Sequence, residues 1–332
     1  MFDRSSEFRR LDGERRGHKS RRQRLSRLGI ILAGRSWVRR PRRQEPGTRY
    51  LVTTRCLGAA FRLRPDAERR ALVGFHLARA QARFPGVIVH AIVQMSNHLH
   101  LVVTDGSGQL SDFMCAFLSP LAKGINALDD VRGPVFERRY TPTPIVDDDA
   151  LLDCIVYTIT NPVAAGLVET PDAWPGLLLW RSDDDGRSFS RVRWRDLARA
   201  RATRTGEPDI AEFTDSSTVR VRPVQLEHRD AARELANALE RRLAELREER
   251  AGRPVLGAKA VKAQGPFDAP ARPEQSRMPL CHASTRELWN TFAEQWRGFV
   301  NAYRRASAAF RHGRLDVEFP AFSFRPWSAN FA

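Results

Sequence analysis

The stretch VIVHAIVQMSNHLHLVV, residues 87–103, decides the fold. Residues 87–95 are almost continuously apolar, as a strand that is buried on both faces would be. A short Met-Ser-Asn turn follows at 95–97, and residues 98–103 form a second run with apolar and β-branched side chains. Two such runs around a short turn predict a β-hairpin.

The flanking residues extend this hairpin into an α+β pattern. Strands are expected at 49–54 and 135–145, helices at 65–84 and 109–128, and a third helix from Asp147 or Asp148 as N-cap. The order β-α-β-β-α-β, followed by one added helix, is that of a ferredoxin-like antiparallel sheet. We therefore predict an α+β fold in which the first two helices cover one face of the sheet and the third covers the other.

Size and charge narrow the class of protein. The chain has 332 residues, of which 42% are hydrophobic, so it is long enough to bury a sizeable core. Its 55 Lys and Arg against 39 Asp and Glu give a formal net charge of +16. A positive field of this size attracts polyanions, of which nucleic acid and an anionic membrane are the usual partners.

Residues 1–47 are the most basic part, with fifteen Lys and Arg against five Asp and Glu, and we predict a disordered basic arm there. The only apolar run in it, residues 28–33, is too short for a secretory core or a membrane span. We therefore expect no export, no membrane partner and a cytoplasmic, nucleoid-associated location. The alternative is that the start codon was placed too early, in which case the arm is barely made at all.

The remaining chain divides into two predicted parts. Residues 48–180 carry the α+β pattern, and 181–332 predict a mostly helical basic extension, with helices near 229–250 and 285–310. A stretch rich in Pro, Gly and Ala at 251–280 predicts a flexible linker within the extension. The four cysteines have no regular spacing, so any metal must take His and oxygen ligands.

His98-Leu99-His100 lies in the second strand of the predicted hairpin. Side chains alternate along a strand, so both imidazoles face one side, about 7 Å apart along the chain, while Leu99 faces the core. Two neutral imidazoles so placed can bind one cation. A bare His-x-His is a weak signal in a chain with eight histidines, and a half-buried strand with a polar outer face is the alternative.

The third helix contains Tyr157 and Asn161, which share one face because they are four residues apart. Pro162 disfavours helix at Asn161, so we expect the helix to end or bend there and free the Asn side chain to reach outward. The alternatives, a core aromatic at Tyr157 and a helix cap at Asn161, stay open at this point.

Together these segments resemble a known family. Met95-Ser96-Asn97-His98-Leu99-His100-Leu101-Val102-Val103 is similar to the HUH segment of single-tyrosine transposases. Residues 157–168, YTITNPVAAGLV, followed by Trp174-Pro175, are similar to the tyrosine helix of the REP-associated branch. The resemblance spans roughly residues 48–180.

The resemblance implies a transposase that nicks and rejoins single-stranded DNA. His98 and His100 would bind the metal, Asn161 would supply a third, polar ligand, and Tyr157 would be the nucleophile that forms a 5′-phosphotyrosine. Two imidazoles, an amide oxygen and phosphate oxygens suit Mg²⁺ or Mn²⁺. The implied partner is single-stranded DNA with a hairpin, bound by a monomer or a homodimer.

Two segments depart from the family pattern. Ser96 stands where a proline is common, and Glu137-Arg138-Arg139-Tyr140 matches the family's aromatic-Arg-Phe strand only loosely. Basic and aromatic side chains hold single strands, which makes four residues candidate DNA contacts, with ordinary strand residues as the alternative. They are Phe136, Arg138, Arg139 and Tyr140. Tyr140 is also the second candidate nucleophile.

Three other functions compete with transposition. A replication initiator or relaxase shares the HUH and tyrosine chemistry, but often adds a helicase or a second nearby tyrosine, and the sequence shows neither. A catalytically silent DNA-binding protein would use its basic arm alone. An RNA-binding ferredoxin-like domain would carry exposed aromatic residues where His98 and His100 stand.

Overall fold

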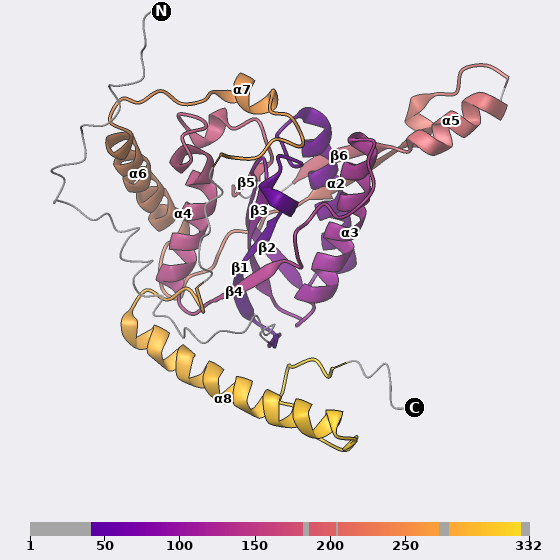
Figure 1. Ribbon diagram of the computed structural model, residues 1–332. Helices are drawn as coiled ribbons and strands as arrows, with labels where there is room; N and C mark the ends of the chain where they lie inside the picture. The colour runs from indigo at the N-terminus through magenta and orange to yellow at the C-terminus, as the bar shows by residue number, and fades with distance from the viewer. Residues whose placement is uncertain (1–40, 182–185, 204, 272–278, 327–332) are drawn as a thin grey trace, which may run out of the picture. The chain divides into compact units, whose positions relative to one another are not determined.

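The computed structural model describes residues 41–181, 186–203, 205–271 and 279–326, and it has an α+β fold (Figure 1). Five strands form the main sheet: β1 (Thr48–Arg55), β2 (Val87–Gln94), β3 (His98–Asp105), β4 (Thr141–Ile145) and β5 (Leu178–Leu179). Their order is β4-β1-β3-β2-β5, with every neighbouring pair antiparallel. The β2–β3 hairpin confirms the prediction for residues 87–103.

Two predictions fall partly outside the described residues. The basic arm was expected at 1–47, and its residues 1–40 are not described. The linker was expected at 251–280, and its residues 272–278 are not described.

Three helices cover the two faces of the sheet. Helices α2 (Ala67–Arg83) and α3 (Leu110–Leu128) lie on one face, and α4 (Asp148–Ala164) lies on the other (Figure 1). Asp66 caps α2 by accepting from the Arg69 amide, and Asp147 caps α4 by accepting from the Ala150 amide. These caps satisfy amides that the first turn of a helix leaves unpaired. Short 3₁₀ turns occur at η1 (Leu57–Ala59) and η2 (Pro171–Ala173).

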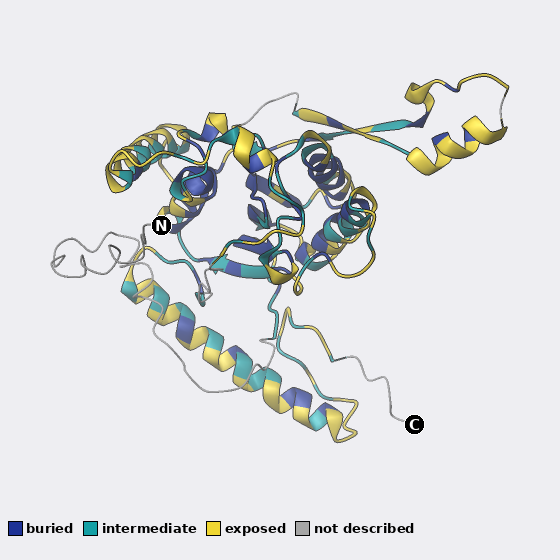
Figure 2. Cartoon of the chain, turned by 45° about the horizontal axis from the view of Figure 1, so that its top comes forward, coloured by how far each residue is buried: buried dark blue, intermediate teal, exposed yellow. Residues whose placement is uncertain are grey.

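The alternation of β3 divides its side chains between two apolar cores. Leu99 and Leu101 are fully buried in the core under α2 and α3. Val102 is fully buried in a separate core under α4. Burying one such side chain stabilises the fold by about 1.5–3 kcal/mol, so the sheet is held from both sides. Buried residues accordingly gather on the strands and on the sheet-facing sides of these helices (Figure 2).

The predicted strand at 135–145 is shorter in the structure. Only Thr141–Ile145 form β4, while Phe136 makes an isolated bridge to Cys56. The pairing register shifts here, because Thr141 lies opposite Thr53 but Phe136 lies opposite Cys56. Residues 137–140 therefore stand opposite only two residues of β1, and this bulge interrupts the strand.

The expected helix end at Asn161 is wrong, because α4 continues through Pro162 to Ala164. Asn161 is only 9% exposed, so its side chain does not reach outward. Proline removes one helical hydrogen bond, but only the last turn follows it here. Val163, in that turn, is buried against Trp174 and Met95, and this packing holds the turn in place.

The extension beyond residue 180 contains strands as well as helices. A hairpin that we did not predict pairs β6 (Arg187–Val192) with β7 (Thr214–Val219), and α5 (Trp194–Thr203) and η3 (Ile210–Phe213) lie between the two strands. The later helices are α6 (Ala231–Arg250), α7 (Ala258–Lys262) and α8 (Arg286–Arg311).

Two parts of this extension pack on the predicted domain. The ring of Phe189 in β6 lies so close to Gly74 in α2 that a Cβ there would approach it to 2.4 Å. Leu235 and Leu239 of α6 pack against the core under α4. Within the described ranges, no helix is long and apolar enough to cross a membrane.

Candidate active site

β3 brings the two histidine side chains together on the face that α4 covers. The rings of His98 and His100 are 4.7 Å apart between centroids and meet nearly edge to face, at 80°. Leu99 between them is fully buried on the opposite face. The strand alternation predicted from the sequence therefore produces a histidine pair.

A neighbouring oxygen fixes the Nδ1 atom of each ring. Thr53, directly opposite His100 in the β1–β3 register, places its Oγ1 2.9 Å from His100 Nδ1. Asn97 places its Oδ1 2.6 Å from His98 Nδ1. An Nδ1 that donates its proton to an oxygen leaves Nε2 with a free lone pair, which is the arrangement of metal-binding histidines.

Both imidazoles are held in the neutral form. Burial, and after it the charge of Arg55, lowers the pKa of His98 to about 3. Burial lowers the pKa of His100 well below its usual value, with smaller effects from His98, Arg55 and His282. Neutral imidazole is the form that binds a metal, so the electrostatics of the site favour a ligand role.

Tyr157 of α4 lies beside the histidine pair. Its hydroxyl is 3.4 Å from His100 Nε2, and the two rings meet at 71° with centroids 5.2 Å apart. The side chain is 39% exposed, an unusual value on a helix whose neighbouring residues are mostly buried. The phenol oxygen is therefore both next to the histidine pair and accessible to a substrate.

The other three tyrosines have different surroundings. Tyr50 and Tyr140 are only 3% and 7% exposed. Burial raises the pKa of Tyr50 to about 12 and also raises the pKa of Tyr140. Tyr303 of α8 donates its hydroxyl to the Phe324 carbonyl at 3.0 Å. Tyr157 is the tyrosine that combines exposure with the histidine pair.

The donor set differs from that of a structural zinc ion. Among the described residues no group of three or more His, Cys, Asp or Glu could hold a metal, so a closed four-ligand zinc site is not formed there. Two neutral imidazoles could bind a cation whose other ligands come from elsewhere, and Asn161 lies one helical turn after Tyr157. Asn161 as the third ligand stays a prediction.

The candidate DNA contacts divide into two pairs. Arg138 and Arg139 are exposed and available to a phosphate backbone. Tyr140 is buried in the core under α2 and α3, and Phe136 is partly buried against that core. The predicted base stacking by Tyr140 does not fit this burial, because Arg42 lies 4.2 Å above the ring and Ser111 Oγ is 3.1 Å from the hydroxyl.

Three residues near the site were not predicted from the sequence. Thr53 and Asn97 orient the histidines, and Thr53 becomes recognisable only when the β1–β3 register is known. His282, in the extension, runs parallel to β4: its amide donates to the Pro144 carbonyl at 2.8 Å, and its carbonyl accepts from the Val146 amide at 2.9 Å. It lies close enough to lower the pKa of His100.

Comparisons with known proteins give one distant structural similarity. A solved structure of a REP-associated tyrosine transposase bound to a REP hairpin is 16% identical, with a TM-score of 0.35. The match covers 43% of this chain and 81% of that one. No protein-family model matches the chain. The search of curated proteins finds no match either.

Proposed function

We propose that this chain is a metal-dependent single-stranded DNA transposase of the single-tyrosine HUH type. The sequence supports this through the HUH segment at 95–103 and the tyrosine helix at 157–168, which resemble the REP-associated branch. We also assign the β4-β1-β3-β2 part of the sheet to the ferredoxin-like arrangement that such enzymes are expected to have.

One observation carries the proposal. The Tyr157 hydroxyl lies 3.4 Å from His100 Nε2, beside a second imidazole, although Tyr157 and His100 are 57 residues apart in sequence. A half-buried strand with a polar outer face would not need an exposed phenol at this position. All three side chains come from one chain, so a second copy is not needed to bring them together.

The reaction we propose is a transesterification at phosphorus. The Tyr157 oxygen attacks the scissile phosphate and loses its proton, the bond from phosphorus to the 3′ oxygen breaks, and the 3′ oxygen leaves as a hydroxyl. The product is a 5′-phosphotyrosine that conserves the energy of the phosphodiester bond. A later 3′-hydroxyl can reverse the step and join a different strand without ATP.

His98, His100 and Asn161 would hold the Mg²⁺ or Mn²⁺ ion. When bound, the ion polarises the scissile phosphate and offsets its charge. The protein's own part is to present neutral imidazoles, through burial and through the oxygens of Thr53 and Asn97, and to hold the phenol beside them.

The partner we propose is single-stranded DNA carrying a hairpin. The net charge of +16 favours a polyanion. That the strand is single follows from the family resemblance, and basic and aromatic side chains are the groups that hold single strands. Exposed Arg138 and Arg139 are the candidate backbone contacts. The hairpin follows from the family resemblance alone.

A covalent-adduct assay tests the proposal. The protein is incubated with labelled hairpin-bearing single strands and Mn²⁺, and the products are separated in SDS. We expect an SDS-stable adduct that Tyr157→Phe abolishes and that the matched control Tyr140→Phe retains. An adduct that persists in Tyr157→Phe would move the nucleophile elsewhere, and no adduct with any hairpin would favour a DNA-binding protein without catalysis.

A further inference from the structure

A segment of the extension, residues 256–268, runs from the tyrosine helix to the turn before the histidine strand, and we call it the strap. At one end the Leu256 and Gly257 amides donate to the carbonyls of Gly166 and Leu167, each at 2.9 Å. These carbonyls follow directly after α4, so the two bonds attach this end of the strap to the segment that leaves the tyrosine helix.

The middle of the strap is part of a core that also contains side chains of the tyrosine helix and of the hairpin segment that leads into the histidine strand. Val261 of α7 is fully buried in a cluster with Val163, from the last turn of α4. The same cluster contains Val93 of β2 and Met95 of the turn. One apolar side chain of the extension therefore packs against the tyrosine helix and the hairpin together.

At the other end the strap is hydrogen-bonded to the turn itself. Ser96 is 5% exposed, and its hydroxyl donates to Gln264 Oε1 at 2.6 Å. The next residue, Asn97, places its Oδ1 2.6 Å from His98 Nδ1. The residue that contacts Gln264 is thus followed directly by the residue that orients the first histidine.

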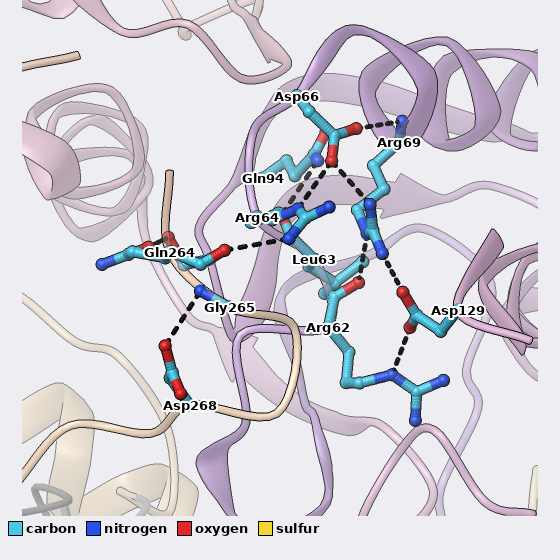
Figure 3. Close-up of polar contacts among 11 residues, drawn as sticks. Arg62, Leu63, Arg64, Asp66, Arg69, Gln94, Asp129, Gln264, Gly265 and Asp268 are labelled. Carbon is cyan, nitrogen blue, oxygen red and sulfur yellow. Dashed lines mark hydrogen bonds and ion pairs between the residues drawn. The ribbon is translucent and has the colours of Figure 1, made fainter. Parts of the chain in front are cut away.

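The main chain at Gln264 is in turn fixed by a partly buried ionic network (Figure 3). Its backbone carbonyl accepts from Arg64 Nη1 at 3.0 Å, and Arg64 Nε donates to Asp66 at 2.9 Å. Asp66 also pairs with Arg69 at 2.5 Å, and Arg69 pairs with Asp129 at the end of α3. The network thus holds the main chain at Gln264, and this limits where the Gln264 side chain can lie.

The last strap residue makes two further contacts. The Asp268 carbonyl accepts from the Phe61 amide at 2.8 Å, and its Oδ2 accepts from the Gly265 amide at 2.9 Å (Figure 3). These bonds close the turn around Gln264 and attach it to the loop between η1 and α2. The strap thus has fixed points on both sides of the Ser96 contact.

We propose that the strap sets the position of the histidine strand relative to the tyrosine helix, with Ser96 and Gln264 as positioning residues. This rests on the proposed function, since it assigns the pair a role in the same reaction. This role accounts for Ser96 at a position where the family commonly has proline, because proline has no hydroxyl to donate to Gln264. Neither residue is assigned contact with DNA.

The test uses the full-length protein and four single variants. Gln264→Ala and Ser96→Ala each remove the hydrogen bond, and Gln264→Glu keeps an acceptor oxygen in the same place. Lys259→Ala, an exposed strap position, is the matched control. We measure the single-turnover rate of adduct formation at saturating Mn²⁺, the unfolding midpoint, and hydrogen exchange in peptides covering 93–100.

We expect Gln264→Ala and Ser96→Ala to slow adduct formation about tenfold each, since displacing reacting groups slightly is enough for that. The double variant Ser96→Ala/Gln264→Ala should be no slower than either single variant, because both substitutions remove the same hydrogen bond. Gln264→Glu should restore the rate, and Lys259→Ala should match the wild type. The proposal is overturned if all variants form the adduct at the wild-type rate. It is also overturned if the rate falls only in variants whose unfolding midpoint falls with it.

Hydrogen exchange separates this proposal from the proposed function. If the wild type forms no adduct, the transposase proposal fails, but Gln264→Ala should still speed exchange at 93–100 and leave exchange at 48–55 unchanged. Unchanged exchange at 93–100 would show that the strap does not hold the turn, whatever the enzyme does.

Discussion

The two faces of the main sheet are built from the same strands but differ in what they hold. Under α2 and α3, β3 contributes Leu99 and Leu101 to an apolar core, where Phe113 and Phe117 of α3 are fully buried. Under α4 the same strand contributes His98 and His100, and the helix presents a phenol that is 39% exposed. One face therefore carries much of the stability, and the end of the other carries the candidate chemistry.

The largest effect we expect concerns the face under α4. His100→Ala should slow adduct formation a thousandfold or more, since a metal supplies several kcal/mol and about 1.4 kcal/mol corresponds to a factor of ten in rate. The control is His90→Gln, on β2, because both ring nitrogens of His90 are already occupied by the Arg222 carbonyl and the Thr104 hydroxyl. Comparable slowing in both variants would mean that the loss is structural.

The opposite face should respond in stability. Phe117→Ala should lower the free energy of unfolding by about 3–5 kcal/mol, because it opens a cavity in a fully packed core. Tyr157→Phe should change it by less than about 0.5 kcal/mol, since it removes only a partly exposed hydroxyl. Urea unfolding of both variants measures the difference, and a large loss in Tyr157→Phe would assign Tyr157 to the core.

A third prediction uses a histidine that has no metal-site geometry. His76 of α2 is 3% exposed and its Nε2 has no hydrogen-bond partner in the described part of the chain. Burial, with smaller effects from Arg191 and Arg79, lowers its pKa to about 4 from 6.5. The unfolded chain therefore binds a proton more readily than the native state between these two pH values.

The sign of the resulting pH dependence follows directly. Above about pH 6.5 His76 is neutral in both states, so it does not affect the free energy of unfolding. As the pH drops from about 6.5 to about 4, the unfolded chain binds a proton that the native state does not, and the free energy of unfolding falls by roughly 3 kcal/mol in total. His76→Leu should remove this part of the acid sensitivity and leave the unfolding free energy at pH 8 unchanged or higher. An identical slope against pH in the variant and the wild type would contradict it.

The smallest effect concerns the orientation of a ligand. Thr53→Val keeps the shape of the side chain but removes the Oγ1 that lies 2.9 Å from His100 Nδ1. We expect Mn²⁺ affinity to fall about 10- to 100-fold, the usual cost of losing such a partner. Thr53→Ser should retain affinity, and calorimetric titration of the three proteins measures it. Equal affinity in Thr53→Val and the wild type would remove Thr53 from the site.

Much of the fold under both faces is readable from local sequence. The apolar run at 87–95 and the turn at 95–97 predict the hairpin, and the periodicity of 109–128 predicts α3, because these signals depend on neighbouring residues. Two local signals failed where packing or pairing decided the outcome. Pro162 did not end α4, and a bulge at residues 137–140 interrupted the predicted strand.

The candidate site was only partly predictable, for a related reason. His98, His100 and Tyr157 stand in motifs that can be recognised along the chain. Their surroundings depend on contacts between distant residues: Thr53 meets His100 through strand register, and Ser96 meets Gln264 across 168 residues of sequence. No periodicity or spacing encodes such contacts, so they require the three-dimensional structure.

Binding of Mn²⁺ tests the central claim most directly, since the histidine pair is proposed to hold the ion beside the phenol. Electron paramagnetic resonance of Mn²⁺ added to the wild type should reveal one bound ion with coupling to imidazole nitrogen. The coupling should be lost in His98→Ala/His100→Ala and retained in His90→Gln. A wild type that binds no Mn²⁺, or a double variant whose nitrogen coupling equals that of the wild type, would contradict the claim.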